Sequence, residues 1–345
     1  MPYGRAFALG VEEELLLVDP TTHLLAHDAQ RLLGLPGLAP DLYLALVESA
    51  TPICADAPGA IAALAATRAR LREAGATVIG AGIHPDGPFG EAPHIPTDRY
   101  RAVGDQLRGL ARRTPTCALH VHVGMPDEET ALRVHNGLRE HTPLLTALAA
   151  NSPFWHGQDS LMASARTAMF RAYPRAEIPP AFDTWAEYEA YVGAVCHAGD
   201  LPDYTFLWWD LRPHPRLGTV ELRAMDAQSS LRDALGLAGF VHALARAAAA
   251  GAEPPWTPRQ SLMESSFRAA RDGIEATLLH DGTLRPVPDI VAALLRTVDG
   301  PGLEEVERIA AANGAARQRE AHAAGGMPAV LALLADEAAR DPGSG

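Results

Sequence analysis

Apolar residues recur at helical spacing in five stretches of the chain, which predicts five helices. The predicted helices span residues 59–74, 127–149, 229–250, 303–323 and 327–340. Asp127 opens the second, Asp233 lies in the first turn of the third, and Gly75 and Gly251 follow the first and third. Acidic residues favour helix starts and glycine favours helix ends, so capping chemistry supports these boundaries.

Shorter apolar runs, rich in β-branched residues and separated by turn residues, predict strands. They lie at residues 7–18, 44–49, 76–82, 117–124 and 218–225. Helices and strands do not alternate regularly, which argues against a parallel sheet built from βαβ units. We therefore expect an α+β fold with a curved, largely antiparallel β-sheet and helices packed on its outer face. Residues 1–340 are expected to form a single domain and residues 341–345 a frayed tail.

The charge of the chain is acidic, and its basic side chains are all of one kind. The 345 residues include 42 acidic and 29 basic side chains, a formal net charge of −13, and every basic residue is arginine. A nucleic-acid-binding protein would show a basic balance, so we expect no nucleic-acid partner. The absence of lysine excludes a Schiff-base lysine, the usual pyridoxal-phosphate chemistry and a Walker-A loop. Arginine, backbone amides and metal ions must therefore handle any phosphate.

The cysteines and the apolar runs indicate a cellular location. Cys54, Cys117 and Cys196 are far apart and form no Cys-x-x-Cys pair, which is typical of a reducing compartment. The first ten residues lack the pattern of a signal peptide, and no run approaches the length of a membrane span. We expect a cytoplasmic protein with no membrane partner.

Two predicted strands carry paired polar side chains on one face. Residues two apart in a strand point the same way, so Glu12 and Glu14 lie together, opposite Glu13. By the same rule His120 and His122 share a face, and valines take the other. Paired carboxylates on an apolar strand need a cation between them, and paired imidazoles are common metal or phosphate ligands. The alternatives are a solvated strand end for the glutamates and satisfied core histidines.

Further polar residues extend this set. Glu221 and Arg223 share a strand face, where one can hold a divalent ion and the other a phosphate oxygen; the alternative is a surface ion pair. Glu48 lies in an apolar run and needs a partner if buried, and Asp41 is a weaker candidate nearby. The stretch 208–216 is dense in arginine, histidine and indole, as in a packed loop or a ligand pocket. The oxygen-rich set favours Mg²⁺ or Mn²⁺ with a polyphosphate over zinc.

Seven segments match the motifs of a known family, in the family order and over nearly the whole chain. They are GVEEE at 10–14, LVESATPIC at 46–54, HVHVG at 120–124, NSPFWHG at 151–157, ASAR at 163–166, WWDLRPHPRLGTVELR at 208–223 and NGAARQR at 313–319. On these motifs the chain resembles the type 2 glutamate–cysteine ligase family, the YbdK-type carboxylate–amine ligases. These are relatives of glutamine synthetase in their catalytic fold, and the long sixth segment is highly specific.

The resemblance implies an ATP-dependent ligase that forms an amide through an acyl phosphate, in a funnel-shaped site lined by the sheet. It implies small-molecule substrates, the γ-carboxylate of glutamate and the amine of cysteine or another amine, and a homodimer. By analogy, the ligands of Mg²⁺ or Mn²⁺ are Glu12, Glu14, Asp41, Glu48, His120 and Glu221. Arg223, with Glu221, is expected to act in catalysis by steadying the γ-phosphate as it transfers. His122 is expected to contact nucleotide phosphate, and Arg166 and Arg212 to clamp the substrate carboxylate.

The segment 264–273 departs from the family pattern. Ser265 and Ser266 stand where an asparagine and a basic residue usually follow the glutamate, and Asp272 stands where a tyrosine usually precedes the glycine. These departures bear on the specificity for acceptor or carboxylate and not on the phosphate chemistry.

Two other functions are compatible with parts of the pattern. One is a ligand-binding protein that keeps the fold without catalysis, although such a protein has no reason to keep mutually repelling carboxylates. The other is a metal-dependent amidohydrolase, which also carries His-x-His on a strand. That pair normally opens the first strand, whereas His120 follows a third of this chain, and many amidohydrolases use a lysine that this chain lacks.

Overall fold

The centre of the protein is an antiparallel β-sheet. The structure, a computed structural model, describes residues 2–90, 92–251 and 254–340, and the tail expected at 341–345 lies outside these ranges. The sheet has seven strands in the order β2-β3-β1-β5-β9-β8, and β4 pairs with β1. All of these pairings are antiparallel. The expected antiparallel sheet is therefore confirmed.

The five strands predicted from the sequence all belong to this sheet. They are β1 (Leu9–Val18), β3 (Leu46–Ala50), β4 (Thr77–Ile79), β5 (Ala118–Gly124) and β9 (Thr219–Asp226). Two edge strands complete the sheet, β2 (Leu38–Pro40) and β8 (Leu211–His214), and two small hairpins lie outside it. The hairpins are β6 (Phe154–Trp155) with β7 (Gln158–Asp159), and β10 (Thr277–His280) with β11 (Thr283–Pro286). Both edge strands contain proline, which breaks a strand pattern in the sequence.

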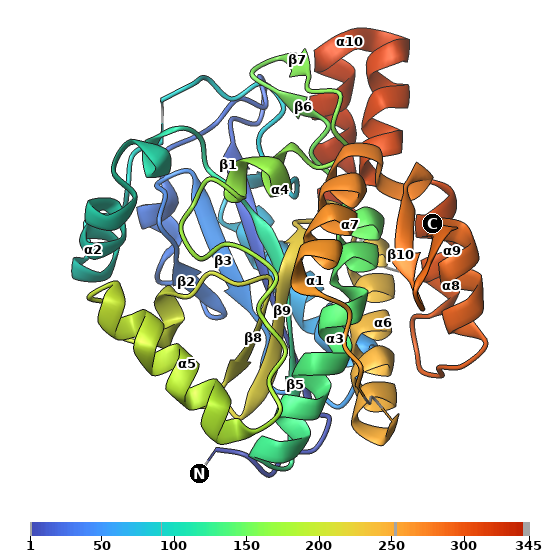
Figure 1. Cartoon of the computed structure of the whole chain (residues 1–345). Coiled ribbons are helices and arrows are strands. Elements are labelled where there is room, and N and C mark those ends of the chain that lie inside the picture. Colours follow the sequence, from blue (N-terminus) through green and yellow to red (C-terminus); the bar gives the residue numbers. More distant parts are fainter. Residues whose placement is uncertain (1, 91, 252–253, 341–345) are drawn as a thin grey trace.

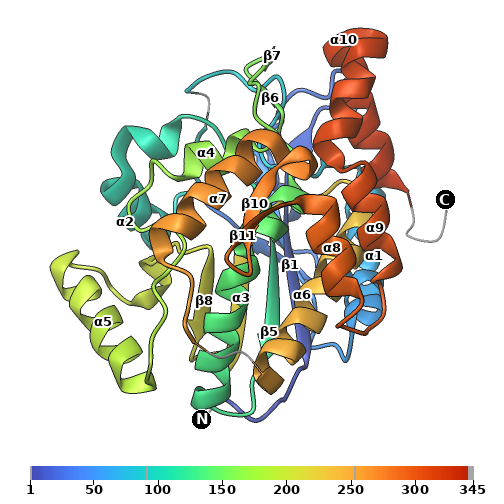
Figure 2. The same cartoon turned by 45° about the vertical axis from the view of Figure 1, so that its right-hand side comes forward.

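Helices cover one face of the sheet. The predicted helices α1 (Ala57–Glu73), α3 (Glu128–Ala149) and α6 (Leu231–Gly251) are confirmed, and they contact β1, β9 and β5. Figures 1 and 2 show α3 and α6 lying along the sheet. The core between the layers contains Val11, Val121 and Leu222 of the strands and Leu138 and Phe240 of the helices. This face is the outer, helix-covered face that the sequence predicts.

Helix α6 is long and apolar enough to cross a membrane by length and composition alone, but it is mostly buried inside the protein. Core helices of soluble proteins have the same character. The apolar sequence of α6 is therefore explained by its burial in the core.

The sequence predicts one continuous helix over 303–323, and this prediction is wrong because the structure has two helices there. The structure has α9 (Glu304–Ala311) and then α10 (Gly314–Ala339), which kinks at Gly325–Gly326 and takes in the helix predicted at 327–340. Asn313 separates the two helices because its side chain caps α10 by accepting from Ala316 N and also donates to Ala147 O. A Cβ at Gly314 would meet Asn151 Oδ1 at 2.0 Å, so the chain needs glycine where it passes Asn151.

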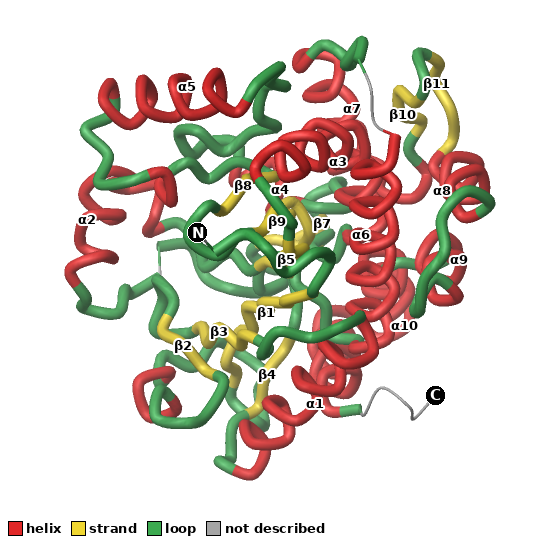
Figure 3. Tube along the Cα trace, turned by 90° about the horizontal axis from the view of Figure 1, so that it is seen from below, coloured by secondary structure: helices red, strands yellow, loops and turns green. Residues whose placement is uncertain are grey.

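The other face of the sheet is flanked by elements that the sequence patterns do not reveal. Figure 3 shows α2 (Asp98–Leu107) and α5 (Trp185–Ala198) on the side of the strands away from α1, α3 and α6. The remaining helices are α4 (Ala165–Phe170), α7 (Arg259–Asp272) and α8 (Val287–Leu295). The polar side chains of the strands point from this face of the sheet toward α2.

Candidate active site

The register of the sheet brings the predicted acidic and imidazole side chains together. Glu12 of β1 lies opposite His120 of β5, and His122 of β5 lies opposite Glu221 of β9. Opposed residues in an antiparallel pair have Cβ atoms about 4.5–5.5 Å apart. Side chains from three consecutive strands of the sheet are therefore within reach of one another. Glu13 points to the helix-covered face, as the strand period requires.

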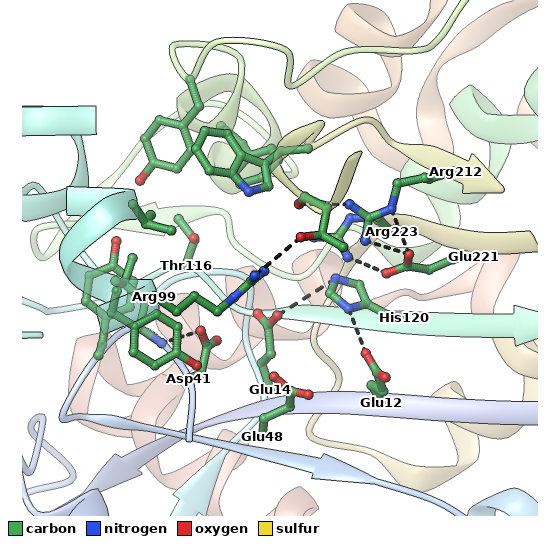
Figure 4. A pocket seen from close by; sticks show the side chains of 18 of the residues that line it. Glu12, Glu14, Asp41, Glu48, Arg99, Thr116, His120, Arg212, Glu221 and Arg223 are labelled. Carbon is green, nitrogen blue, oxygen red and sulfur yellow. Dashed lines mark hydrogen bonds and ion pairs between the residues drawn. The ribbon is translucent and has the colours of Figure 1, made fainter. Parts of the chain in front are cut away.

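The polar face of the sheet forms one wall of a cavity of about 400 Å³ (Figure 4). The predicted site residues all line this cavity: Glu12, Glu14, Asp41, Glu48, His120, His122, Arg166, Arg212, Glu221 and Arg223. Within the stretch 208–216, Trp208 and His214 also line it, whereas Trp209 and Asp210 are buried and do not. The alternative of a solvated strand end or a surface ion pair does not apply to these side chains.

The wall opposite the sheet contains residues that the sequence analysis did not single out. Arg99 and Tyr100 come from α2, Phe170 from α4, and Thr205 from a short 3-10 helix (Tyr204–Phe206) before β8. One local signal was available: Thr97 is an N-cap residue, and its hydroxyl accepts from Tyr100 N at 3.2 Å. That signal predicts where a helix begins, but it does not indicate which of its side chains point toward the cavity.

Three ligand atoms are close enough to share one cation. Oxygen or nitrogen atoms of Glu12, His120 and Glu221 all lie within 4.8 Å of one another. His120 Nδ1 is 3.5 Å from Glu12 Oε2, and His122 Nε2 is 3.3 Å from Glu12 Oε1. Two carboxylates with an imidazole fit Mg²⁺ or Mn²⁺, because those ions prefer oxygen ligands and accept imidazole.

A second acidic group adjoins this trio. Glu14 of β1 lies opposite Glu48 of β3, and Asp41 lines the same part of the cavity. Burial and, after it, repulsion from the neighbouring Asp41 carboxyl raise the pKa of Glu14 to about 8. Burial also raises the pKa values of Glu48 and Asp41, and for Glu48 the repulsion from Asp41 adds to the effect. A divalent cation would relieve this repulsion, so the residues present fit a metal site.

Glu221 is held in its ionised form by two arginines. Arg212 donates to Glu221 Oε2 from Nε at 3.1 Å and from Nη2 at 2.8 Å, and Arg223 Nη1 donates to Oε1. Burial opposes ionisation, but the Arg212 and Arg223 charges hold the pKa of Glu221 well below its usual range. Arg212 Nη1 donates to the carbonyl oxygens of Thr205 and Leu207, at 3.0 Å each. Most of the N–H donors of Arg212 are thus already hydrogen-bonded to acceptors within the protein.

Arg166 is anchored by a buried carboxylate outside the cavity lining. Its Nη1 lies 3.7 Å from Asp226 Oδ1, and Asp226 accepts from Asn151 N, Ser152 Oγ and Ser164 Oγ at 2.7–2.9 Å. The motifs at 151–157 and 163–166 therefore converge on Asp226, at the end of β9. The Nε of Arg166 has no hydrogen-bond partner among the residues that the structure describes.

The departures from the family pattern lie away from the cavity. Ser266 Oγ accepts from Arg171 at 2.9 Å, Ser265 Oγ accepts from Leu279 N at 3.1 Å, and Asp272 pairs with Arg271 at the surface. None of these three departures belongs to the cavity lining in the described structure. Ser265 and Ser266 therefore have structural partners of their own.

Comparison with known proteins places the chain in a family. The family model described as glutamate–cysteine ligase family 2 matches residues 8–331. Two Rubrobacter xylanophilus proteins carry the provisional names glutamate–cysteine ligase 2-3 and 2-1. The first is 39% identical over 358 residues, covering 96% of this chain and 97% of the relative. The second is 36% identical over 340 residues, covering 92% and 90%.

Solved structures show the same fold at low sequence identity. The glutamate–cysteine ligase of Francisella tularensis, solved with AMP, has a TM-score of 0.70 and 12% identity and covers 99% of this chain and 94% of its own. A bifunctional glutathione synthetase from Pasteurella multocida has a TM-score of 0.61 and 17% identity, covering 97% of this chain and 51% of its own. Given the matching family model and the long, closely similar relatives, the chain belongs to glutamate–cysteine ligase family 2.

Proposed function

We propose that this protein is an ATP-dependent carboxylate–amine ligase that forms an amide through an acyl phosphate. The proposed donor is the γ-carboxylate of glutamate, and the acceptor is the amine of cysteine or another amine. We propose that it acts in the cytoplasm on small molecules. The observation that carries the proposal is the single cavity that combines a carboxylate cluster with arginines. Phosphoryl transfer needs positioning and neutralisation of charge, which this combination supplies without lysine.

The proposed holders of Mg²⁺ or Mn²⁺ are the acidic residues of the cavity and His120. When bound, such ions would neutralise the charge of the nucleotide phosphates. Glu12, His120 and Glu221 form the proposed first site, and Glu14, Asp41 and Glu48 the proposed second group. The Francisella ligase that shares the fold was solved with AMP, which supports an adenine nucleotide as cosubstrate.

Arg223 is the proposed catalytic arginine because its guanidinium lines the cavity beside Glu221. Its Nε is buried and has no hydrogen-bond partner in the described part of the chain, so it can donate to a phosphate oxygen. Arg166 is proposed to hold the substrate carboxylate, and His122 to contact nucleotide phosphate. For Arg212 we propose positioning of Glu221 in place of a substrate clamp, since its donors already serve Glu221 and two carbonyls.

A direct test is a screen of amino acids for ATP-to-ADP conversion with Mg²⁺ and hydroxylamine. Hydroxylamine attacks an acyl phosphate and leaves a stable hydroxamate. Formation of the hydroxamate with glutamate is the expected result and would identify the donor. If no carboxylate gave hydroxamate or ADP, the non-catalytic binding protein would replace the ligase. Conversion of a substrate at the same rate with and without ATP would favour a hydrolase.

Glu12→Gln tests the assignment of the metal ligands. It keeps the size of the side chain but removes a charge from the trio, so we expect Mg²⁺-dependent ADP formation to fall at least about 100-fold. Mg²⁺ should raise the melting temperature of the wild type by more than that of the variant, in which only the second acidic group is intact. Glu304→Gln, at an exposed glutamate of α9, is the matched control and should behave as wild type. Normal turnover by Glu12→Gln would contradict the metal site.

A further inference from the structure

Four arginines line the cavity, and three of them are held by buried carboxylates. Arg212 and Arg223 pair with Glu221, and Arg166 lies 3.7 Å from Asp226. Arg99 differs from these three, because no carboxylate of the described residues lies within ion-pair distance of it. Arg99 is near enough to Asp41 for its charge to favour the ionised form of that carboxyl, but in the described part of the chain none of its N–H donors is committed to a carboxylate.

Arg99 reaches into the cavity from the side opposite the sheet. It is the second residue of α2, and Figure 4 shows its side chain entering the cavity from that side. Nη1 donates to Thr205 Oγ1 at 3.3 Å, and the guanidinium carbon lies 5.4 Å from the centre of the Phe206 ring. A single long hydrogen bond to a neutral hydroxyl leaves most of the guanidinium donors available.

The position of Arg99 suits an anion that lies between the sheet and α2. The carboxylates on the sheet side repel an anionic ligand unless cations cover them, so a ligand held there by metal ions presents its outer oxygens to the opposite wall. Arg99 belongs to that wall, and a planar guanidinium can give two parallel hydrogen bonds to a carboxylate or a phosphate. The stacking of Arg99 on Phe206 limits its freedom and holds the fork near the cavity.

We propose that Arg99 is a substrate-binding residue that donates to an oxyanion of the bound substrate from the α2 side of the cavity. The oxyanion is either a nucleotide phosphate or the carboxylate of the amino-acid donor, since both have the same hydrogen-bonding chemistry. The inference rests on the proposed ligase function, because that function supplies both anions.

The test compares Arg99→Gln with Arg101→Gln. Arg101 lies on the same helix, is 62% exposed and pairs with Asp98, and it does not line the cavity. Binding of L-glutamate and of a non-hydrolysable ATP analogue with Mg²⁺ would be measured by titration calorimetry. We expect Arg99→Gln to weaken binding of one of the two probes at least about tenfold, as for a lost charged hydrogen bond. Arg101→Gln should bind both as the wild type does.

The pattern of losses identifies the anion. Weaker binding of the ATP analogue assigns Arg99 to phosphate, and weaker binding of glutamate assigns it to carboxylate. Arg99→Lys, which keeps the charge but loses the fork, should restore part of the affinity. If Arg99→Gln bound both probes with affinities within about twofold of the wild type, the inference would be overturned. A wild-type protein that binds neither probe would overturn the proposed function itself, and the inference with it.

Discussion

Three consecutive glutamates of β1 have three different environments, which shows how strongly position decides the role of a residue. Glu12 lies between two histidines, and although its burial opposes ionisation, hydrogen bonds from His120 and His122 hold its pKa below the usual range. Glu14 lies among other carboxylates, and its pKa is raised by burial to about 8. Glu13 points to the other face, where Arg68 binds it with two hydrogen bonds of 2.6 and 3.1 Å. The same residue type thus supplies proposed metal ligands on one face and a buried ion pair on the other.

Asp226 allows a prediction at the residue scale. Asp226→Asn keeps the shape but removes the negative charge beside Arg166 and replaces one of the two accepting carboxylate oxygens with an NH2 donor. We expect the KM for the carboxylate substrate to rise at least about tenfold, because Arg166 is less well held, and the free energy of unfolding to fall by about 1–3 kcal/mol. Steady-state kinetics and urea unfolding measure the two effects.

Asp233→Asn provides the matched control for Asp226→Asn. Asp233 is also buried and bound by two arginines, Arg308 and Arg317, but it does not line the cavity. It should lose comparable stability with an unchanged KM. If both variants changed KM equally, Asp226 would have no special relation to Arg166.

Strand β1 is the element on which the site depends, since it pairs with β3, β4 and β5 and carries two of the proposed ligands. Its back face is tied to α1 through Glu13 and Arg68. The Arg68 guanidinium also donates to the carbonyl oxygens of Gln228, at 2.8 Å, and Ser229, which follow β9. One side chain of α1 therefore connects β1 to the end of the strand that carries Glu221.

Arg68→Met tests this connection at the element scale. It leaves the buried Glu13 carboxylate without its counter-charge, and we expect a loss of about 3–5 kcal/mol in the free energy of unfolding. The double variant Arg68→Met/Glu13→Leu should recover most of that loss, because no unpaired charge remains. Urea unfolding measures both. A loss below about 1 kcal/mol in Arg68→Met would show that the pair contributes little.

At the scale of the whole molecule, the protein separates two faces of one sheet by polarity. Helices α1, α3 and α6 bury the apolar face, and the opposite face keeps charged groups around a cavity. Desolvation affects groups on both sides of the molecule. It lowers the pKa of His135, which lies within α3 and does not line the cavity, to about 3. Stability is therefore expected to depend on pH through buried neutral histidines as well as through carboxylates.

His135 makes the pH dependence testable. Its pKa is near 6.5 in the unfolded chain and about 3 in the folded protein, so between these values only the unfolded chain binds the proton. The free energy of unfolding should then fall by about 1.4 kcal/mol for each pH unit below 6.5 from this group. His135→Gln can still donate to Pro180 O and should have a shallower fall between pH 6.5 and 4.5. Equal slopes in wild type and variant, by urea unfolding, would contradict the assignment.

Much of the candidate site could be predicted because it follows from local geometry. An extended chain places every second side chain on the same face, so the pairs Glu12 with Glu14, His120 with His122, and Glu221 with Arg223 were readable from the sequence. The five strands and helices α1, α3 and α6 were readable for the same reason, since they depend on the period of their own residues. The break at Asn313 was missed because the alanine-rich sequence on both sides favours helix, and the cap depends on contacts with Ala147 and Asn151.

The sequence by itself therefore determined five strands of the sheet, helices α1, α3 and α6, the faces of the strands and, through its motifs, the family. Only the tertiary structure decided the order of the strands, the register that opposes Glu12 to His120, and the partners that occupy each arginine. It also decided that α2 turns Arg99 toward the cavity and that Asp226 binds the motifs at 151–157 and 163–166, which are far from it in the sequence. The physical reason is that periodicity is a property of neighbouring residues, whereas register, burial and ion pairing depend on segments that meet only when the chain is folded.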